Sequence, residues 1–470
     1  MEIKQKKSLG IVLAALVCVV LAAVAWYLYD NNVDRSGWII TGDGVTYYKD
    51  FHGRKVTGWQ DIEGHRYYFD EKKRMVTHWQ QLEGERYYFT SDGDMVTDWQ
   101  EIADQRYYFS PEGVLQTGWL EQSGSRYYLG TDGVLSTGWR DIDGQRYYFG
   151  DDGAMTVGWG DIGRERYYFS VHGMMLTGFL HLTEGSYYFD DTGAMRTGRV
   201  SADGGEYLFG QDGKMVTGWH TDSEGRRYYT PEGPMATGWQ EIDGSRYFFT
   251  DSGLAHTGWY TEGEYSYYFL EDGTAAVGEQ KIDGNRYYFT PRGIHVVLVN
   301  ASHPVPGYYK MKLVTVTGWH QVSEVCHDAL VKMLADCVAA GNQYTFNSAH
   351  RTIEEQTQIL EMRTKEHMKN FDLDEKAARA KALQTVAYPG TSEHHLGLAV
   401  DILNQPAIDW LTEHCWDYGF IVRYTAEKAG ITGIVDEPWH FRYVGREVAL
   451  DMKDSGLCLE EYLGAVPVSQ

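Results

Sequence analysis

Residues 138–157 read GWRDIDGQRYYFGDDGAMTV, and the same pattern begins again at Gly158. Thirteen such units fill residues 37–297, the first of 21 residues and the others of 20. Within a unit, aromatic strand formers are bounded by turn residues such as Asp152 and Gly153, which predicts one short β-hairpin per unit. Because so short a unit cannot bury its own apolar face, successive hairpins are expected to pack on one another as an all-β hairpin-repeat solenoid.

The composition of the whole chain narrows its class. A hydrophobic content of 43% over 470 residues argues against wholesale disorder. The formal net charge of −24 argues against a partner that is a nucleic acid. The counts of 36 Tyr and 15 Trp are high, and most of these rings are expected to form the core of the repeats.

The N-terminal segment predicts a membrane anchor. Residues 9–29 contain no charged side chain, and as a helix they would extend about 31 Å, the thickness of the hydrocarbon core of a bilayer. Lys4, Lys6 and Lys7 precede this stretch, so the N-terminus is expected in the cytoplasm and the rest of the chain outside the cell. A cleaved signal peptide stays open as an alternative, because Ala-Val-Ala at 23–25 fits a cleavage site.

The repeat pattern ends at about Val297, and the remaining residues predict a compact α+β domain. Helices are expected at 321–340, 353–370 and 375–387, and strands at 344–346, 399–403, 420–424 and 439–444. The chain is therefore predicted to be multidomain, with a cytoplasmic tip and transmembrane helix at 1–29, the repeat solenoid at 30–297 and the α+β domain at 298–470. Pairing of Cys415 with Cys458 stays open.

Two short stretches of the last domain carry metal-binding side chains, PGTSEHHLGLAVD at 389–401 and EPWHFR at 437–442. His394, Asp401 and His440 together offer two imidazoles and one carboxylate, a ligand set that suits zinc and leaves a fourth position for water. Glu437 lies three residues before His440 and could take a proton from that water. The sequence therefore predicts a zinc peptidase domain.

These two stretches resemble the motifs Ser-x-His…Asp and Glu-x-x-His of metal-dependent D-alanyl-D-alanine carboxypeptidases of the vancomycin-resistance type. The resemblance implies a cell-surface enzyme that removes the terminal D-alanine from peptidoglycan stem peptides. It implies zinc ligation by His394, Asp401 and His440, a catalytic base in Glu437, oxyanion stabilisation by Arg351, and substrate contacts from Ser392 and Gln356. An L,D-carboxypeptidase, a dipeptidase, an endopeptidase and a non-catalytic wall-binding protein stay open as alternatives.

The repeats resemble the cell-wall-binding repeats of choline-binding and glucan-binding bacterial surface proteins. Choline-binding repeats usually place another aromatic residue before the Tyr pair, whereas nine units here have Arg, for example Arg146. A cation at that place would repel choline, so the expected ligand is a wall glycan or a teichoic-type polymer, with choline less favoured. Phe179, Arg199 and Glu279 replace the Trp in three units, whose grooves are expected to be degenerate.

Other charged residues of the last domain are interpreted without a function. Glu354, Glu355 and Glu393 are expected to be solvated charges, and His350, His367, His395 and His414 to be surface or core residues rather than ligands.

Overall fold

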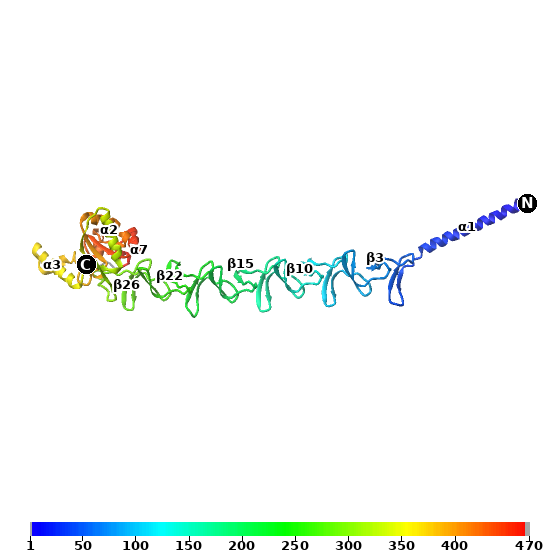
Figure 1. Ribbon diagram of the computed structural model, residues 1–470, viewed down its shortest axis with the longest axis horizontal. Coiled ribbons are helices and arrows are strands. Elements are labelled where there is room, and N and C mark those ends of the chain that lie inside the picture. The colour runs from blue at the N-terminus through cyan, green and yellow to red at the C-terminus, as the bar shows by residue number, and fades with distance from the viewer. Residues whose placement is uncertain (1, 466–470) are drawn as a thin grey trace. The chain divides into compact units, whose positions relative to one another are not determined.

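The computed structural model describes residues 2–465, with side chains from residue 12 onward. The chain divides into two compact units, one comprising Met1–Gly198 with Phe209–Met215 and the other Arg199–Leu208 with Val216–Gln470. The last repeats and the C-terminal domain thus belong to the same unit. Figure 1 shows the order of the elements along the chain.

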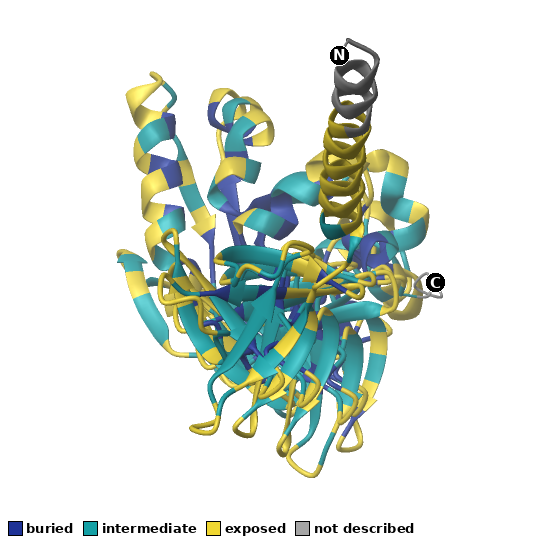
Figure 2. Ribbon diagram, turned by 90° about the vertical axis from the view of Figure 1, so that its right-hand side faces the viewer, coloured by how far each residue is buried: buried dark blue, intermediate teal, exposed yellow. Residues whose placement is uncertain are grey.

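The N-terminal helix α1 (Glu2–Asn32) contains a stretch long and apolar enough to cross a membrane. This stretch, Val12–Asn32, has a mean hydropathy of 2.5 and no buried part. All of its residues except Asp30 are exposed, and Figure 2 shows this helix in the colour of exposed residues. The same length and composition would suit a signal sequence, so α1 fits both readings of the N-terminal segment. The side chains of Lys4, Lys6 and Lys7 lie outside the described residues.

Thirteen two-stranded antiparallel hairpins follow α1, as the repeat pattern predicts. The pairs are β1 (Gly37–Ile40) with β2 (Thr46–Lys49), β3 (Gly58–Ile62) with β4 (His65–Phe69), β5 (His78–Leu82) with β6 (Glu85–Phe89), β7 (Asp98–Ile102) with β8 (Gln105–Phe109), β9 (Gly118–Gln122) with β10 (Ser125–Leu129), β11 (Gly138–Ile142) with β12 (Gln145–Phe149), β13 (Gly158–Ile162) with β14 (Glu165–Phe169), β15 (Gly178–Leu182) with β16 (Gly185–Phe189), β17 (Gly198–Ala202) with β18 (Gly205–Phe209), β19 (Gly218–Thr221) with β20 (Arg226–Tyr229), β21 (Gly238–Ile242) with β22 (Ser245–Phe249), β23 (Gly258–Glu262) with β24 (Tyr265–Phe269), and β25 (Gly278–Ile282) with β26 (Asn285–Phe289).

The turn of each hairpin and its contacts with neighbours explain why the repeat folds this way. In β11–β12, Asp143 and Gly144 connect the strands with φ of +52° and +77°, the left-handed geometry that a tight two-residue hairpin turn needs. Phe149 has no exposed surface, and its ring centroid lies 6.1 Å from that of Trp119 in the preceding repeat. The Met155 amide donates to the Arg126 carbonyl of that repeat at 2.8 Å. Each hairpin therefore completes its core with the side chains of its neighbour.

The C-terminal domain is built on a four-stranded antiparallel sheet with the order β29-β30-β32-β31. Its strands are β29 (Thr345–Ser348), β30 (Ala399–Leu403), β31 (Phe420–Tyr424) and β32 (Glu437–Tyr443), and a separate hairpin is formed by β27 (Leu313–Thr317) and β28 (His320–Ser323). In the register of β30 with β32, Asp401 lies directly opposite His440. Two candidate ligands are thus neighbours across one strand pair.

Helices accompany this sheet. They are α2 (Glu324–Ala339), α3 (Ile353–Phe371), α4 (Glu375–Ala382), α5 (Gln405–His414), α6 (Ala429–Thr432), α7 (Arg446–Ser455) and α8 (Leu459–Tyr462), with the 3₁₀ helices η1 (Glu393–Leu396), η2 (Cys415–Tyr418) and η3 (Ala426–Lys428). The predicted helix at 321–340 begins later, because its first residues form β28. The predicted helix at 375–387 ends early, at Ala382. The strands expected at 399–403 and 420–424 have the predicted bounds.

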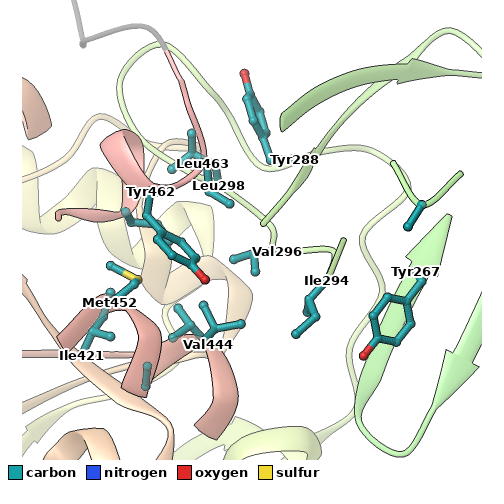
Figure 3. Packing of buried hydrophobic residues seen from close by; sticks show 14 of the residues in the cluster. Tyr267, Tyr288, Ile294, Val296, Leu298, Ile421, Val444, Met452, Tyr462 and Leu463 are labelled. Carbon is teal, nitrogen blue, oxygen red and sulfur yellow. The ribbon is translucent and has the colours of Figure 1, made fainter. Parts of the chain in front are cut away.

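A single apolar cluster joins the last repeats to the C-terminal domain. Ile294, Val296 and Leu298 lie between repeat residues such as Tyr267 and domain residues such as Met452, all of them buried. Figure 3 shows these side chains facing one another. The boundary predicted at 297/298 therefore falls inside a continuous core.

The described cysteines are all free thiols. Cys415 and Cys458 are both buried and are not joined by a disulfide.

Candidate metal centre

Three predicted ligands converge at the centre of the C-terminal domain. One ligand atom from each of His394, Asp401 and His440 lies within 4.8 Å of the other two, and all three residues are buried. Asp401 comes from β30 and His440 from the opposing position of β32. His394 comes from η1, where the Ser392 side chain accepts the His394 amide at 3.4 Å. The fold thus brings together residues from two distant stretches of sequence.

Hydrogen bonds orient both imidazole rings. His394 Nδ1 lies 2.7 Å from the Ala349 carbonyl, which can only accept, so Nδ1 donates and Nε2 faces Asp401 at 3.3 Å. His440 Nε2 lies 3.3 Å from a Glu393 carboxylate oxygen, and His440 Nδ1 lies 3.0 Å from Asp401 Oδ1. Each ring therefore turns one nitrogen toward the shared carboxylate and uses the other to hold its orientation.

The ionisation of this cluster follows from burial and from its ion pairs. Burial lowers the pKa of His394 to about 4, which favours the neutral imidazole that binds metals. Burial also opposes protonation of His440, but its hydrogen bonds to Asp401 and Glu393 outweigh burial and raise its pKa to about 9. Burial disfavours the Asp401 carboxylate, yet His394 and His440 hold its pKa well below the usual range. Asp401 is thus ionised at neutral pH.

Glu437 lies at the start of β32 and lines a cavity of about 190 Å³ together with the three candidate ligands. Glu437 is 8% exposed, and burial raises the pKa of its carboxyl group to about 7. A carboxyl group with such a pKa can both accept and return a proton near neutral pH. No hydrogen bond of the Glu437 side chain is found within the described residues, which leaves the group available to a molecule in the cavity.

Arg351 lines the same cavity and contacts one of the candidate ligands. Its Nη2 donates to Asp401 Oδ2 at 2.6 Å, and its Nε donates to the Ser348 hydroxyl at 2.7 Å. The Gln356 amide oxygen accepts from Arg351 Nη1 at 3.4 Å, while the Gln356 amide nitrogen donates to the Ala387 carbonyl at 2.8 Å. Arg351 is thus held in place from several sides.

Ser392 and Gln356 both line this cavity. Ser392 is 4% exposed and Gln356 is 1% exposed. The side chains of both make hydrogen bonds within the protein.

The interpretation of Glu393 as a solvated charge is wrong. Glu393 is 2% exposed, and Arg423 Nε and Arg442 Nη1 both donate to its Oε1 at 2.9 Å. Burial would raise the pKa of Glu393, but the two guanidinium groups hold it below its usual range. The sequence does contain a signal for this ion pair. Arg423 lies inside the apolar strand Phe420–Tyr424, and a buried guanidinium requires a buried carboxylate as its partner.

His395 is confirmed as a core residue rather than a ligand. Its Nδ1 lies 2.7 Å from the Arg351 carbonyl, and its Nε2 accepts from the Gly390 amide at 3.1 Å. His395 thus supports the backbone that carries Arg351. Glu355, read as solvated, forms a capping box with Thr352 at the start of α3.

The repeats carry a second kind of candidate site, a set of aromatic rings shared by neighbouring hairpins. The ring centroid of Trp139 lies 5.1 Å from that of Tyr148 in its own repeat and 4.9 Å from that of Tyr167 in the next. The Arg146 guanidinium lies 4.8 Å from the centre of the Trp139 ring. Eight Trp rings are covered by an arginine in this way, at 3.7 to 4.9 Å.

Two Trp rings of the described repeats have no arginine over them. Thr46 and Ser266 stand at the arginine place of their units, and Trp38 and Trp259 of those units are 39% and 41% exposed. The ninth arginine, Arg286, instead pairs with Glu279, which replaces the Trp of its unit, at 3.1 Å. Trp38 and Trp259, which lack this arginine, are thus the more exposed Trp residues of the described repeats.

Comparisons with known proteins agree with the division of the chain into a repeat region and a C-terminal domain. Residues 319–446 match the family model "VanY: D-alanyl-D-alanine carboxypeptidase". Residues 56–98, 96–135, 136–170 and 256–293 match a choline-binding repeat, and residues 177–195 and 237–255 match a putative cell wall binding repeat.

Relatives of the C-terminal domain are carboxypeptidases by name. A D-alanyl-D-alanine carboxypeptidase of Enterococcus faecalis (strain ATCC 700802 / V583) is 38% identical over 176 residues, which cover 36% of this chain and 65% of that protein. The putative carboxypeptidase YodJ of Bacillus subtilis (strain 168) is 31% identical over 194 residues, which cover 36% of this chain and 67% of that protein. A crystal structure of a vancomycin-resistance D,D-pentapeptidase VanY in complex with Zn(II) is 38% identical with a TM-score of 0.35, and the match covers 36% of this chain and 97% of that one.

Proposed function

Because the chain belongs, through its C-terminal domain, to the VanY family of D-alanyl-D-alanine carboxypeptidases, we propose that it is a zinc-dependent carboxypeptidase that removes the terminal D-alanine from peptidoglycan stem peptides. The observation that carries the proposal is the convergence of His394, Asp401 and His440 beside the buried carboxyl group of Glu437. Cleavage of an L,D bond, of a dipeptide or of an internal bond would use the same residues, so the products of the reaction decide among these activities.

The donor set fits zinc. Two imidazole nitrogens and one carboxylate lie within 4.8 Å of one another beside the cavity, and such a three-ligand set is typical of catalytic zinc sites. Bound there, zinc would activate a water molecule and polarise the scissile carbonyl group. His394, Asp401 and His440 are the residues that would hold it.

The side chains around the ligands have complementary roles in this proposal. Glu437 takes the proton of the attacking water and returns it to the leaving amine, for which its pKa of about 7 is suited. Arg351, which lines the cavity and contacts Asp401, donates hydrogen bonds to the oxygen that gains negative charge. Ser392 and Gln356, which line the same cavity, hold the substrate peptide there.

The test of this function is the mass of the products. The full chain, freed of metal by a chelator and then reloaded with zinc, is incubated with synthetic tetra- and pentapeptide stems. Loss of a single terminal D-alanine from the pentapeptide, abolished by the chelator and restored by zinc, supports the proposal. Cleavage of another bond contradicts the D,D specificity, and activity that survives complete removal of metal contradicts the zinc mechanism.

For the N-terminal segment we propose a single membrane span with the C-terminal part outside the cell. The exposed apolar stretch of α1 supports this arrangement. The match of the repeats to choline-binding and cell wall binding repeats supports it as well, because such repeats act outside the membrane. Mass spectrometry of the protein from membrane and wall fractions tests this arrangement, because an uncleaved N-terminus in the membrane fraction supports the span and a mature form starting near residue 26 supports a cleaved signal peptide.

For the repeats we propose a wall glycan or an anionic, teichoic-type polymer as ligand, with choline less favoured. The eight arginines that cover Trp rings support this choice, since a guanidinium repels a quaternary ammonium and can hydrogen-bond to hydroxyl and phosphate groups. Sedimentation of the protein with purified glycan, with teichoic polymer and with choline resin distinguishes the three ligands.

A further inference from the structure

Glu393 is the residue of the metal centre for which neither the motifs nor the family match assigns a role. Its carboxylate is enclosed by three partners, since Oε1 accepts from Arg423 and Arg442 at 2.9 Å and Oε2 lies 3.3 Å from His440 Nε2. The side chains of Glu393 and Arg423 have no exposed surface. Glu393 borders the cavity, but its carboxylate oxygens are already occupied by these partners and are not available to a substrate.

The contact with Glu393 determines which nitrogen of the His440 ring faces the other two candidate ligands. A carboxylate paired with two arginines only accepts hydrogen bonds, so His440 Nε2 carries a proton and donates it to Glu393. His440 Nδ1 faces the Asp401 carboxylate at 3.0 Å and donates to it in the metal-free cluster. Loss of that proton on metal binding would leave the Nδ1 lone pair directed at the ligand set, because Nε2 stays bound to Glu393. Rotation of the ring would give up both contacts at once.

We propose that Glu393 is a positioning residue, which holds the His440 ring in the orientation and tautomer that present Nδ1 to the metal. The inference rests on the proposed zinc site. A carboxylate behind a metal-bound histidine fixes the ring and raises its basicity, and loss of such a partner typically lowers metal affinity about 10–100-fold.

The position of Glu393 depends in turn on residues beyond the sheet. Arg423 forms a second, two-pronged ion pair with buried Glu460, with N–O distances of 2.6 and 3.0 Å. Glu460 also accepts from Asn300 at 2.9 Å. The other arginine, Arg442, donates through Nη2 to the carbonyl of Val297 at 2.8 Å. Two carboxylates and two guanidinium groups balance their charges in this buried cluster, and the segment 297–300, at the end of the last repeat, anchors it.

Two substitutions in this cluster separate positioning of His440 from general stability. Glu393→Gln and Glu460→Gln each remove one buried negative charge from the same guanidinium, that of Arg423, but only Glu393 contacts His440. Glu393→Asp keeps the charge and withdraws the carboxylate by one methylene group, so it tests the contact in a chain whose charges remain balanced.

The measurements are the zinc affinity of the full chain, by competition with a chromogenic chelator, and the unfolding temperature of the metal-free protein. We expect Glu393→Gln and Glu393→Asp to lower zinc affinity about 10–100-fold. We expect Glu460→Gln to lower the unfolding temperature while its zinc affinity stays within about threefold of wild type.

Unchanged zinc affinity in the folded Glu393→Asp protein would overturn the proposal, as would an equal loss of affinity in Glu460→Gln. His440→Ala is the reference for a lost ligand. Absence of zinc binding by the wild-type chain would instead contradict the zinc site itself, so the two failures are distinguishable.

Discussion

At the scale of single residues, the chemistry depends on how burial and neighbouring charges set the ionisation of a few side chains. Glu437 and Asp401 are both buried carboxyl groups of one cavity, but burial raises the pKa of Glu437 to about 7, while the two histidines hold that of Asp401 low. One carboxyl group is therefore suited to exchange a proton and the other to remain a ligand.

Replacement of Glu437 tests its role as the base. We expect Glu437→Gln to lower kcat/KM on the order of 10²–10⁴-fold, because a positioned acid–base group contributes about that much. Glu354→Gln, which neutralises an exposed carboxylate of the same domain, is the matched control and should retain activity. Full activity of Glu437→Gln in peptide hydrolysis assays would rule out this role.

The pH dependence of the reaction follows from the same carboxyl group. A base acts in its ionised form, so kcat/KM should rise with pH as Glu437 loses its proton, with a midpoint at or below pH 7 because a bound dication favours the carboxylate. Initial rates of the wild-type enzyme, measured at about ten pH values between 4 and 8, determine the midpoint of this rise in kcat/KM. An activity that falls over that interval would be inconsistent with a base in this position.

Arg351 should separate turnover from metal binding. Its guanidinium lies 2.6 Å from a ligand oxygen, so it stabilises negative charge in the transition state but competes with a cation for Asp401. We expect Arg351→Met to lower kcat about 10²–10³-fold and to leave zinc affinity unchanged or higher. Arg363→Met, a change at the same cavity in a residue that pairs with Glu366, is the control. A loss of zinc affinity in Arg351→Met would show that the arginine supports the ligands instead.

At the scale of elements, each hairpin repeats one arrangement of rings, and a single side chain changes what that arrangement can bind. Where the arginine is present its guanidinium covers the Trp, and where Ser266 replaces it Trp259 is 41% exposed. A quaternary ammonium ion thus meets an open Trp ring in few repeats, whereas a polymer with anionic or hydroxyl groups meets a row of donors.

Removal of these arginines should increase binding of choline. Arg146→Ser, Arg226→Ser and Arg246→Ser together would open three Trp faces, and each cation–π contact contributes about 0.5–2 kcal/mol. We expect the triple variant to elute later than wild type from a choline resin at equal salt. Arg286→Ser is the matched control, because Arg286 faces Glu279 rather than a Trp. Equal retention of Arg286→Ser and the single variant Arg146→Ser, which remove the same charge, would mean that net charge and not an opened Trp face governs the effect.

At the scale of the whole molecule, the described structure makes the last repeats part of the fold of the C-terminal domain. Ile294 and Val296 belong to the same apolar cluster as Val448 and Met452. Arg292 pairs with Glu447 at 2.8 Å and with Asp451 at 3.1 Å. The repeats therefore do more than tether this domain, because they complete its core.

A truncation series tests this dependence. Burial of Ile294 and Val296 contributes about 1.5–3 kcal/mol each, so a chain of residues 298–470 should unfold roughly 10 °C or more below one of residues 216–470. Circular dichroism of both metal-free chains measures the difference. Equal unfolding temperatures would show that the domain is independent of the repeats.

Sequence alone was sufficient for features that depend on near neighbours in the chain. The hairpins follow from turn residues and strand formers within one unit, as with Asp143 and Gly144, and the apolar helix follows from a run of uncharged residues. The residue types of His394, Asp401 and His440 were also recognisable, because a short motif carries them.

Only the tertiary structure decided how these pieces combine. The pairing of β30 with β32, about 40 residues apart, sets Asp401 opposite His440, and no local pattern specifies that register. The burial of Glu393 between two arginines, the guanidinium over eight Trp rings of the repeats and the core shared across Val297 likewise depend on chain segments meeting in space. Local propensities select the elements, whereas burial and charge pairing between distant residues decide which side chains face one another.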